Sequence, residues 1–506
     1  MMGMKNKYLY KMVVLIGICV SFSACEKYLN EMPQNKMKPS TTEDYEQLLN
    51  KAYITRSVLP YLDVLTDDMD FDAQSYKEEG RANYADEVLG AYMWNNSIET
   101  TMANGDQAFE SFYNSIFYTN VVIDNIDDAI GMVLDEAVVR RERGSIKGEA
   151  LALRAYNYFY LVNLYAAPYD PATCETTPGI PINLSTAAED KAYTRASLKA
   201  VYAQMVDDLK EGIRLMEENP VEKGTKQRFS AIAARALLAR VYLFMHEWDL
   251  AIEQASEVIK QNPAIYNLYE AGNDPSINAD NTISWGQVTT QDYLSVDNAN
   301  VLFAHGLNEF YMIFHPHPFY SVFRVDEKLA SLYDDGDVRK PRFMRKVSFV
   351  GVTRLLLIKN GYYNLVSDGN YGWLPSLDYG VVRVIRTEEM YLILAEAYAR
   401  KDDSGKAVGY LNQLRKEKFM EGQYTPLLAS DFNKNSLLDK VYLERRLELC
   451  FEGHRWFDLR RTTRPAIEHT GVRGQKAVLK ENDPRYVLQI PANELSVNPE
   501  IGTNPR

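Results

Sequence analysis

Hydrophobic residues recur at three- and four-residue steps through much of this chain, a pattern that predicts a mainly α-helical fold. The capping sequence STTE at 40–43 precedes apolar residues at this spacing and predicts the start of a helix. The same periodicity predicts helices over 109–133, 146–165 and 197–218.

The stretch LERRLELCFEGHRWFDLRR at 443–461 carries the strongest periodic pattern near the end of the chain. It predicts one amphipathic helix that closes a large helical domain. Its charged residues are expected on the solvent side, with Arg445 facing Glu448 and Glu452 facing Arg455. Gly453 within this helix indicates a close neighbour. An anion site made by the arginines is the alternative, which the neighbouring carboxylates disfavour.

Two pairs of predicted helices share the register of tetratricopeptide repeats, in which small residues let two helices approach closely. In the first pair, the matching positions are Leu238, Ala239, Tyr242, Ala251 and Pro263. In the second pair, they are Tyr391, Leu394, Ala395, Tyr398 and Ala407. We therefore expect a scaffold of stacked helical pairs.

Two segments, 59–105 and 266–380, lack this period and are rich in Asn, Asp, Tyr and Trp. They predict an irregular, loop-rich lobe with short β segments near 300–304 and 354–358, followed by an extended tail at 466–506. Aromatic rings beside amides and acids can bind a sugar, because a flat ring covers the apolar face while the polar groups bond the hydroxyls. Packing of the same aromatics in the core is the alternative. The candidate ligand-binding residues are Asp67, Arg81, Trp94, Asn95, Trp285, Tyr293, Tyr311 and Trp373.

The first 24 residues have a basic start, a short apolar run and a small-residue exit, as in a signal peptide. The sequence FSAC at 22–25 resembles a lipobox, which predicts acylation of Cys25 and a tether over 25–39. Attachment to a membrane through acyl chains on Cys25 is therefore expected. The net charge of −13 argues against nucleic acid as a partner.

Motifs for catalysis are missing from the sequence: it has no GxSxG, HExxH or Gly-rich phosphate loop. His315 and His317 could hold a metal, and the acid pairs Asp67-Asp68 and Glu388-Glu389 could mimic a glycosidase. Neither alternative is favoured, and Glu388-Glu389 more simply begin a helix. We expect no enzyme activity, no cofactor and no metal site.

The stretch ERRLELCFEGHRWFDLRR closely resembles the C-terminal signature of the SusD/RagB family, surface lipoproteins of glycan-uptake systems in Bacteroidetes. STTEDYEQLLNKAY, GEALALRAYNYFYLVNLYA and LQIPANELSVNPEIGTNP are similar to other segments of that family. The resemblance implies a tetratricopeptide-like helical fold, a lipid anchor in the outer membrane that faces the cell exterior, glycan binding at the cell surface and capping of a SusC-like TonB-dependent transporter. It places Asp67, Arg81, Trp94 and Asn95 near the segments that contact sugar.

We therefore predict one SusD-like domain over 40–506, with a helical scaffold at about 40–58, 106–265 and 381–465. Its function would be to bind oligosaccharide or polysaccharide and deliver it to the transporter. A peptide-binding or purely lid-type subunit of such a transporter is the alternative, and a glycoside hydrolase is a further one.

Overall fold

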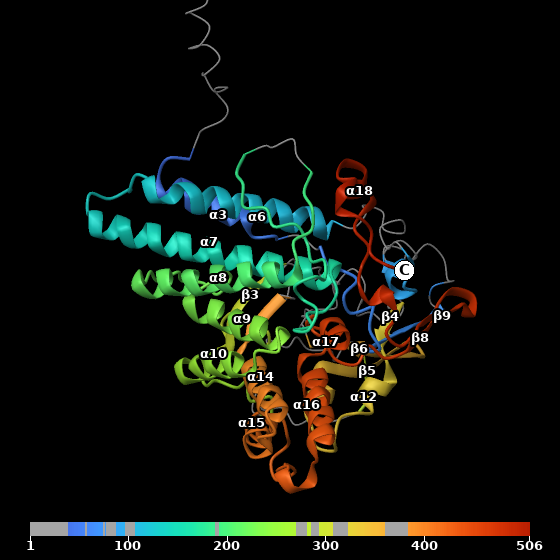
Figure 1. Cartoon of the computed structure of the whole chain (residues 1–506). Helices are drawn as coiled ribbons and strands as arrows, with labels where there is room; N and C mark the ends of the chain where they lie inside the picture. Colours follow the sequence, from blue (N-terminus) through green and yellow to red (C-terminus); the bar gives the residue numbers. More distant parts are fainter. Residues whose placement is uncertain are drawn as a thin grey trace, which may run out of the picture.

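The computed structural model shows a layer of long helices with short strands gathered toward one end (Figure 1). The prediction of a mainly α-helical fold is confirmed. The structure describes residues 39–55, 58–73, 76, 88–96, 107–187, 192–269, 281–284, 293–306, 322–359 and 383–506. The predicted signal peptide and all of the predicted tether except Pro39 lie outside these residues.

Three long helices form the first part of the scaffold: α3 (Thr42–Ala52), α6 (Ala108–Asn125) and α7 (Glu136–Tyr165). The predicted capping sequence is confirmed, because Thr41 and Asp44 form a reciprocal capping box at the start of α3. α7 packs against α3, α6, α8 and α9, so nearly every side chain from Ile146 onward is buried. The helix predicted to run to residue 133 ends at Asn125, and α7 begins ten residues before the predicted start.

The two predicted repeat pairs are confirmed as helical hairpins. The first consists of α9 (Ala231–Phe244) and α10 (Trp248–Gln261), and the second of α14 (Thr387–Arg400) and α15 (Ser404–Lys416). α10 packs on α14, so the two pairs stack although more than a hundred residues separate them along the chain. α8 (Leu198–Glu218) joins the first pair to α7.

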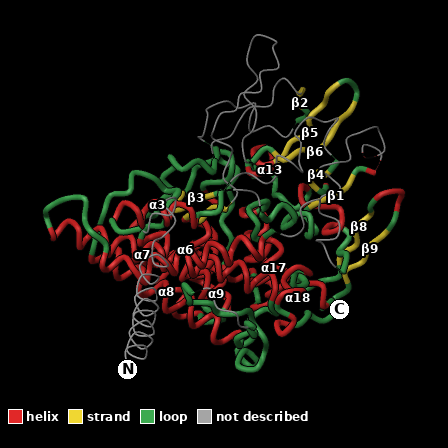
Figure 2. The backbone as a smooth tube through the Cα atoms, turned by 90° about the horizontal axis from the view of Figure 1, so that it is seen from above, coloured by secondary structure: helices red, strands yellow, loops and turns green. Residues whose placement is uncertain are grey.

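The strands form four small sheets, of which three lie toward one end of the helical layer, while β3 lies among the helices (Figure 2). β1 (Met69–Phe71) pairs with β4 (Phe323–Val325), β3 (Val301–His305) with β7 (Arg383–Arg386), and β8 (Ile467–Thr470) with β9 (Lys476–Leu479), all antiparallel. β5 (Met344–Phe349) lies between β2 (Ile283–Ser284), its parallel neighbour, and β6 (Val352–Leu357), its antiparallel neighbour. β3 and β6 confirm the two predicted β segments.

The remaining elements are short. They are α12 (Glu327–Ala330), α13 (Arg339–Phe343), α18 (Ala492–Val497) and the 3-10 turns η1 (Ile126–Asp128), η4 (Ala429–Asp431), η5 (Val472–Gly474), η6 (Pro484–Tyr486) and η7 (Pro499–Ile501). The tail predicted to be extended instead folds into the β8–β9 hairpin and α18. Its end packs against α7, where Asn504 Nδ2 donates to Tyr165 O at 2.8 Å.

The segment 443–461 is two helices rather than one, which corrects the sequence prediction. α16 (Lys434–Leu449) stops before a turn, and α17 (Arg455–Arg461) starts a new direction. Phe451 and Gly453 have φ of 58° and 76° in this turn, a left-handed conformation that no helix continues through. The predicted close neighbour of Gly453 is confirmed, because a Cβ atom there would lie 3.3 Å from Leu62 Cδ1.

The charged face of this segment is buried instead of solvated. The exposed fractions of Glu444, Arg445, Glu448 and Glu452 are 0%, 1%, 0% and 4%. A pattern of charges at helical spacing normally marks solvent, but here other parts of the chain supply buried countercharges. We call the buried acids and their buried countercharges the buried ion network. Its cations are Arg339, Lys359, Arg386, Arg415 and Lys418, and its anions are Asp337, Glu388, Glu444, Glu448 and Glu452.

Glu448 and Arg386 lie at the centre of the buried ion network. Arg386 NH1 donates to Glu448 Oε1 at 2.8 Å, and its Nε donates to Glu452 Oε2 at 2.9 Å. Lys359 Nζ lies 2.6 Å from Glu452 Oε1. Burial opposes a charge on Glu448, but the surrounding lysines and arginines outweigh it and hold its pKa well below the ordinary value.

The partners predicted within 443–461 are therefore wrong. Arg445 pairs with Asp458, with Nε 3.2 Å from Oδ2, and Arg455 pairs with Asp67. Arg461 donates both guanidinium nitrogens to Glu396 at 2.6 and 2.7 Å. These bonds tie the chain end to α14 and to the loop before β1.

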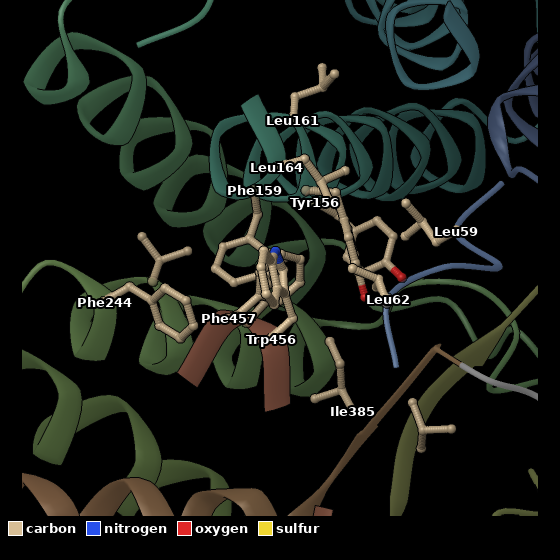
Figure 3. Close-up of a cluster of buried hydrophobic side chains, with 14 of the residues drawn as sticks. Leu59, Leu62, Tyr156, Phe159, Leu161, Leu164, Phe244, Ile385, Trp456 and Phe457 are labelled. Carbon is tan, nitrogen blue, oxygen red and sulfur yellow. The ribbon is translucent and has the colours of Figure 1, made fainter. Parts of the chain in front are cut away.

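Apolar packing completes the attachment of α17 to the scaffold. Figure 3 shows Trp456 and Phe457 beside Phe159, Tyr156 and Phe244. The Phe159 ring centroid lies 6.2 Å from that of Phe457 and 5.1 Å from that of Phe244, both edge to face. Because Trp456 is fully buried, this segment closes the helical domain as predicted, although as two helices.

Replacing Arg386 tests the buried ion network. Arg386→Met leaves Glu448 and Glu452 buried with fewer countercharges, and we expect a loss of about 3–5 kcal/mol in the free energy of unfolding. Urea unfolding followed by tryptophan fluorescence measures this loss. Arg214→Met is the matched control, because Arg214 pairs with Glu211 and Glu218 on the surface of α8 and should change stability little. Equal effects of the two substitutions would contradict a central role of the network.

The network also predicts how stability depends on pH. Burial raises the pKa of Glu444 and Glu452, but the nearby cations lower it more. The result is a pKa of about 2 for each, compared with the ordinary value of 4.5. Between these values the unfolded chain binds protons that the folded chain does not, so acid favours unfolding. Stability should be fully present above about pH 4.5 and fall as the pH approaches 2. Urea midpoints measured across this range should decline less steeply for Glu452→Gln, and a level profile for the unmodified protein would refute the expectation.

Candidate functional site

Asp67, Trp94 and Asn95 are the predicted ligand residues of the first irregular segment that the structure describes, and Asp67 lies just before β1, which packs against β4 and β8. The loop before β1 is fastened to α16 and α17 by two arginines. Arg455 Nε and NH2 each donate to one oxygen of Asp67 at 2.8 Å. Arg446 Nε donates to Asp68 Oδ1 at 2.7 Å, and its NH2 lies 3.1 Å from Asp67 Oδ2.

Asp67 is thus a link between the loop and the helices. Burial opposes its charge, but the hydrogen bonds and charge of Arg455, together with Arg446, lower the pKa of Asp67 below its ordinary value. Both carboxylate oxygens accept charged hydrogen bonds, which are strong and directional. A direct contact between Asp67 and a ligand stays a prediction, whereas its role in holding the loop is visible.

Trp94 lies in the core, which corrects the prediction that its ring contacts a ligand. Only 1% of the residue is exposed, and Nε1 donates to Leu65 O at 3.0 Å. The ring stacks on His469 with centroids 4.0 Å apart, and Tyr92 stacks on the other face of His469 at the same distance. Because the Trp94 residue is 1% exposed and its ring is stacked on His469, the ring cannot stack on a sugar.

His469 joins the two loops that carry the candidate residues. Its Nδ1 lies 2.7 Å from Tyr92 O and its Nε2 lies 2.9 Å from Thr66 O. Burial lowers the pKa of His469 to about 4, while the two carbonyl oxygens act in the opposite direction. The imidazole therefore connects Thr66 of the loop before β1 with the segment around Tyr92.

Asn95 is exposed, unlike its neighbour Trp94. Trp94 has φ of 47°, and this left-handed residue turns the chain so that Asn95 emerges at the surface. Arg485 NH1 donates to Trp94 O at 3.3 Å, and Arg506 Nε donates to Asn96 O at 3.1 Å. The carboxyl-terminal part of the chain therefore supports the backbone on which the Asn95 amide is presented.

A polar pair that the sequence analysis did not single out lies on the neighbouring strands. Asp70 of β1 faces Arg324 of β4 in the strand register, and Arg324 Nε donates to Asp70 Oδ2 at 2.8 Å. Their side chains are 40% and 30% exposed. Arg324 also lies near Asp72, to which Arg354 of β6 is paired at 2.6 Å. The polar middle residue of the β1 sequence MDF was a usable signal, but its partner lies 254 residues away.

Buried rings join the elements that carry these polar groups. The Phe71 ring lies 5.7 Å from Tyr92 and 5.3 Å from Phe323, and Tyr92 and Phe323 are also 5.3 Å apart. The aromatics thus form a layer beneath β1, β4 and the segment 88–96. We call the three solvent-accessible polar residues on these elements, Asp70, Arg324 and Asn95, the polar surface.

Tyr293 is a second correction. It is 2% exposed, its hydroxyl donates to Glu448, and Lys359, Arg386 and Lys418 lie over its ring at 5.7, 4.9 and 5.3 Å from the centroid. Such an environment satisfies both the ring and the hydroxyl within the buried ion network. Tyr293 belongs to the support of the fold and does not face a ligand.

The other predicted site residues fall outside the described part of the chain. They are Cys25, Arg81, Trp285, Tyr311 and Trp373, together with His315 and His317. Glu388 and Glu389 begin α14 as predicted, but they are buried, and Glu389 accepts two hydrogen bonds of 2.6 Å from Arg240. Among the described residues, no group of His, Cys, Asp and Glu has a metal-binding arrangement, and no helix is long and apolar enough to cross a membrane.

Two family models match the chain. One, described as "Starch-binding associating with outer membrane", covers residues 27–243, and the other, described as "SusD family", covers residues 378–506. The chain belongs to the SusD/RagB family. Asp70 and Asn95 of the polar surface lie in the first matched region, and Arg324 lies between the two regions; Arg485 and Arg506, which hold the backbone beside Asn95, lie in the second.

Similar proteins extend over almost the whole chain. A SusD-like protein of Formosa agariphila is 25% identical and covers 99% of both chains. A SusD superfamily structure from Bacteroides vulgatus has a TM-score of 0.69 with 24% identity, covering 92% of this chain and 99% of that one. A structure described as a laminarin-binding SusD-like protein has a TM-score of 0.61 with 21% identity, covering 92% and 100%. These structures show that the fold is shared.

Substitutions at the neighbouring residues Trp94 and Asn95 test whether the first is packed in the core and the second is on the surface. Trp94→Ala removes a buried ring from the stack on His469 and should lower the free energy of unfolding by about 3–5 kcal/mol. Asn95→Ala, one residue further, should change it by no more than about 0.5 kcal/mol because the side chain is exposed. Urea unfolding of both variants provides the comparison. An unchanged stability of Trp94→Ala would show that the ring is not held in the core.

Proposed function

We propose that this protein is a non-catalytic, lipid-anchored protein of the outer cell surface that binds oligosaccharide or polysaccharide. In this proposal it delivers the glycan to a SusC-like TonB-dependent transporter. The observation that carries the proposal is the match of residues 27–243, which include Asp70 and Asn95 of the polar surface, to a family model described as starch-binding and outer-membrane-associated. The laminarin-binding relative of the same fold is consistent with it.

The polar surface has the chemistry that sugar hydroxyls require. Asp70 offers acceptor oxygens, Arg324 offers donors, and the Asn95 amide offers both. The rings of Phe71, Tyr92 and Phe323 below hold these groups on a fixed base. Groups fixed before binding lose less conformational entropy when a ligand arrives, which favours affinity.

The acids that could have served a glycosidase are committed to structure. Asp67 and Asp68 bind Arg455 and Arg446, and Glu389 binds Arg240. Glycoside hydrolysis needs one carboxyl group to donate a proton and a second to attack or activate water on the same bond. Acids held as buried or paired carboxylates are poorly suited to those roles, which supports a binding function without catalysis.

Membrane attachment and delivery rest on the sequence and on the family. Cys25 in its lipobox-like context supplies the proposed anchor, since more than one acyl chain gives stable attachment. A transporter that is permanently capped needs an interface on the order of 2,000 Å² or more. The stacked helical pairs give a broad, rigid body from which such an interface could be built.

The burial of Trp94 and Tyr293 supports a second candidate function, in which the ligand is a peptide or the protein serves only as a lid. Both aromatics pack inside the protein, so they do not form the stacking platform that would distinguish a sugar from another polar ligand. The polar surface alone would also suit a peptide, whose amides and carbonyls use the same donors and acceptors. A peptide-binding or lid-type subunit of the same transporter is therefore the second candidate function.

Isothermal titration against a panel of oligosaccharides and polysaccharides tests the proposal. We expect at least one glycan to bind and Asn95→Ala to weaken it roughly 2- to 10-fold, the value of one hydrogen bond. Asn50→Ala on α3 is the matched control, because this exposed asparagine lies on the scaffold away from the polar surface. Heat from peptides but from no glycan would favour the second candidate, and glycan turnover by the purified protein would overturn the non-catalytic assignment.

A further inference from the structure

The loop between α6 and α7 exposes an unusual concentration of large hydrophobic side chains. Ile130, Met132, Val133 and Leu134 are 65%, 62%, 46% and 105% exposed. Twelve large hydrophobic side chains are exposed in the described part of the chain, and a third of them fall within these five residues. Isolated exposed apolar residues are ordinary, but a local group of them marks a contact surface. We call residues 130–134 the apolar loop.

The apolar loop is held in place by its backbone. Ile130 N donates to Ser40 O at 2.7 Å, and Thr42 N donates to Ile130 O at 3.0 Å. Gly131 packs so closely on α7 that a Cβ atom there would lie 2.0 Å from Val139 Cγ2. These contacts fix the loop on the start of α3 and on α7 while its large side chains point outward.

Its position relates it to the proposed lipid anchor. The loop pairs with Ser40, which follows Cys25 by fifteen residues, a span of at most about 50 Å even when fully extended. Figures 1 and 2 both show the α6–α7 connection at the opposite end of the helical layer from β8 and β9. The apolar loop therefore lies at the end where the anchored segment joins the domain, away from the polar surface.

The charges around the loop are balanced, so electrostatic attraction does not explain the surface. Lys147 pairs with Asp127, and Arg143 NH1 lies 3.3 Å from Glu136. The flanking charges are nearly balanced, with five acids, Asp127, Asp128, Asp135, Glu136 and Glu142, against four bases, Arg140, Arg141, Arg143 and Lys147. An apolar cluster without a basic surround suits insertion among acyl chains better than binding to an acidic protein or to charged headgroups.

We propose that the apolar loop inserts into the outer leaflet of the membrane beside the acylated Cys25, as a second membrane contact of the anchored protein. This inference rests on the proposed lipid anchor. A single flexible attachment leaves the orientation of a protein free, whereas two contacts at one end restrict it. The polar surface at the other end would then face away from the lipid, toward arriving ligand.

Site-directed spin labelling tests the insertion on the full mature, acylated protein in phosphatidylcholine vesicles. A label at Leu134→Cys should become more accessible to oxygen and less accessible to a water-soluble nickel complex when the protein moves from detergent-free buffer to vesicles. Leu428→Cys is the matched control, because this leucine is 58% exposed in a different part of the molecule and should stay in water. Cys174 and Cys450 are buried and should not compete for the label.

A partition measurement gives the loop's own contribution. With Cys25→Ser in the full mature chain, replacement of Met132, Val133 and Leu134 by Ser should reduce vesicle binding at least tenfold, since each apolar side chain withdrawn from lipid weakens it. The substituted side chains are on the surface, so the fold should be retained, which circular dichroism can verify.

The outcomes distinguish the inference from the proposed function. An acylated protein that binds vesicles while the label at 134 stays in water would overturn the inference and leave the lipid anchor standing. A label shielded only when a transporter is added, or only at high protein concentration, would assign the loop to a protein contact and also overturn it. A mature protein that carries no acyl group would remove the anchor itself, whatever the label reports.

Discussion

The fold depends on a balanced set of charges that are shut away from water. Glu448 of α16 accepts hydrogen bonds from Tyr293 and Arg386, and Arg339 and Lys418 lie close to it. Burying one such charge alone would cost several kcal/mol, so each group requires the others to be in place. The network therefore makes the end of the chain, β7 and the loops around α13 fold together or not at all.

This dependence reaches the polar surface by a continuous path. The last turn of α16 and the start of α17 place Arg446 and Arg455 against Asp68 and Asp67, and these ion pairs hold the loop before β1. His469 then connects that loop to Tyr92. The aromatics pack beneath β1, β4 and the segment around Tyr92, so these elements are held from below by buried rings while Asp70, Arg324 and Asn95 remain accessible to solvent.

Local patterns were sufficient for the scaffold. The capping box at Thr41, the two repeat pairs and the strands β3 and β6 lie where the sequence predicts them, because each depends on residues only a few positions apart. The break at Phe451 and Gly453 escaped the same reasoning. Its charges follow helical spacing on both sides, and a periodic pattern does not report a change of direction between two short helices.

What the sequence by itself determined is the helical character, the repeat pairs and the family, all carried by neighbouring residues. Only the tertiary structure decided which polar residues are solvated. The sequence pattern predicts that Glu448 and Glu452 are on the surface. In the structure they are buried beside Arg386, which lies more than sixty positions away in the chain. Trp94 and Asn95 are neighbours in the chain, yet a ring 375 positions further on buries the first and leaves the second exposed. Burial is set by what folds against a residue, and those partners are not written in its local sequence.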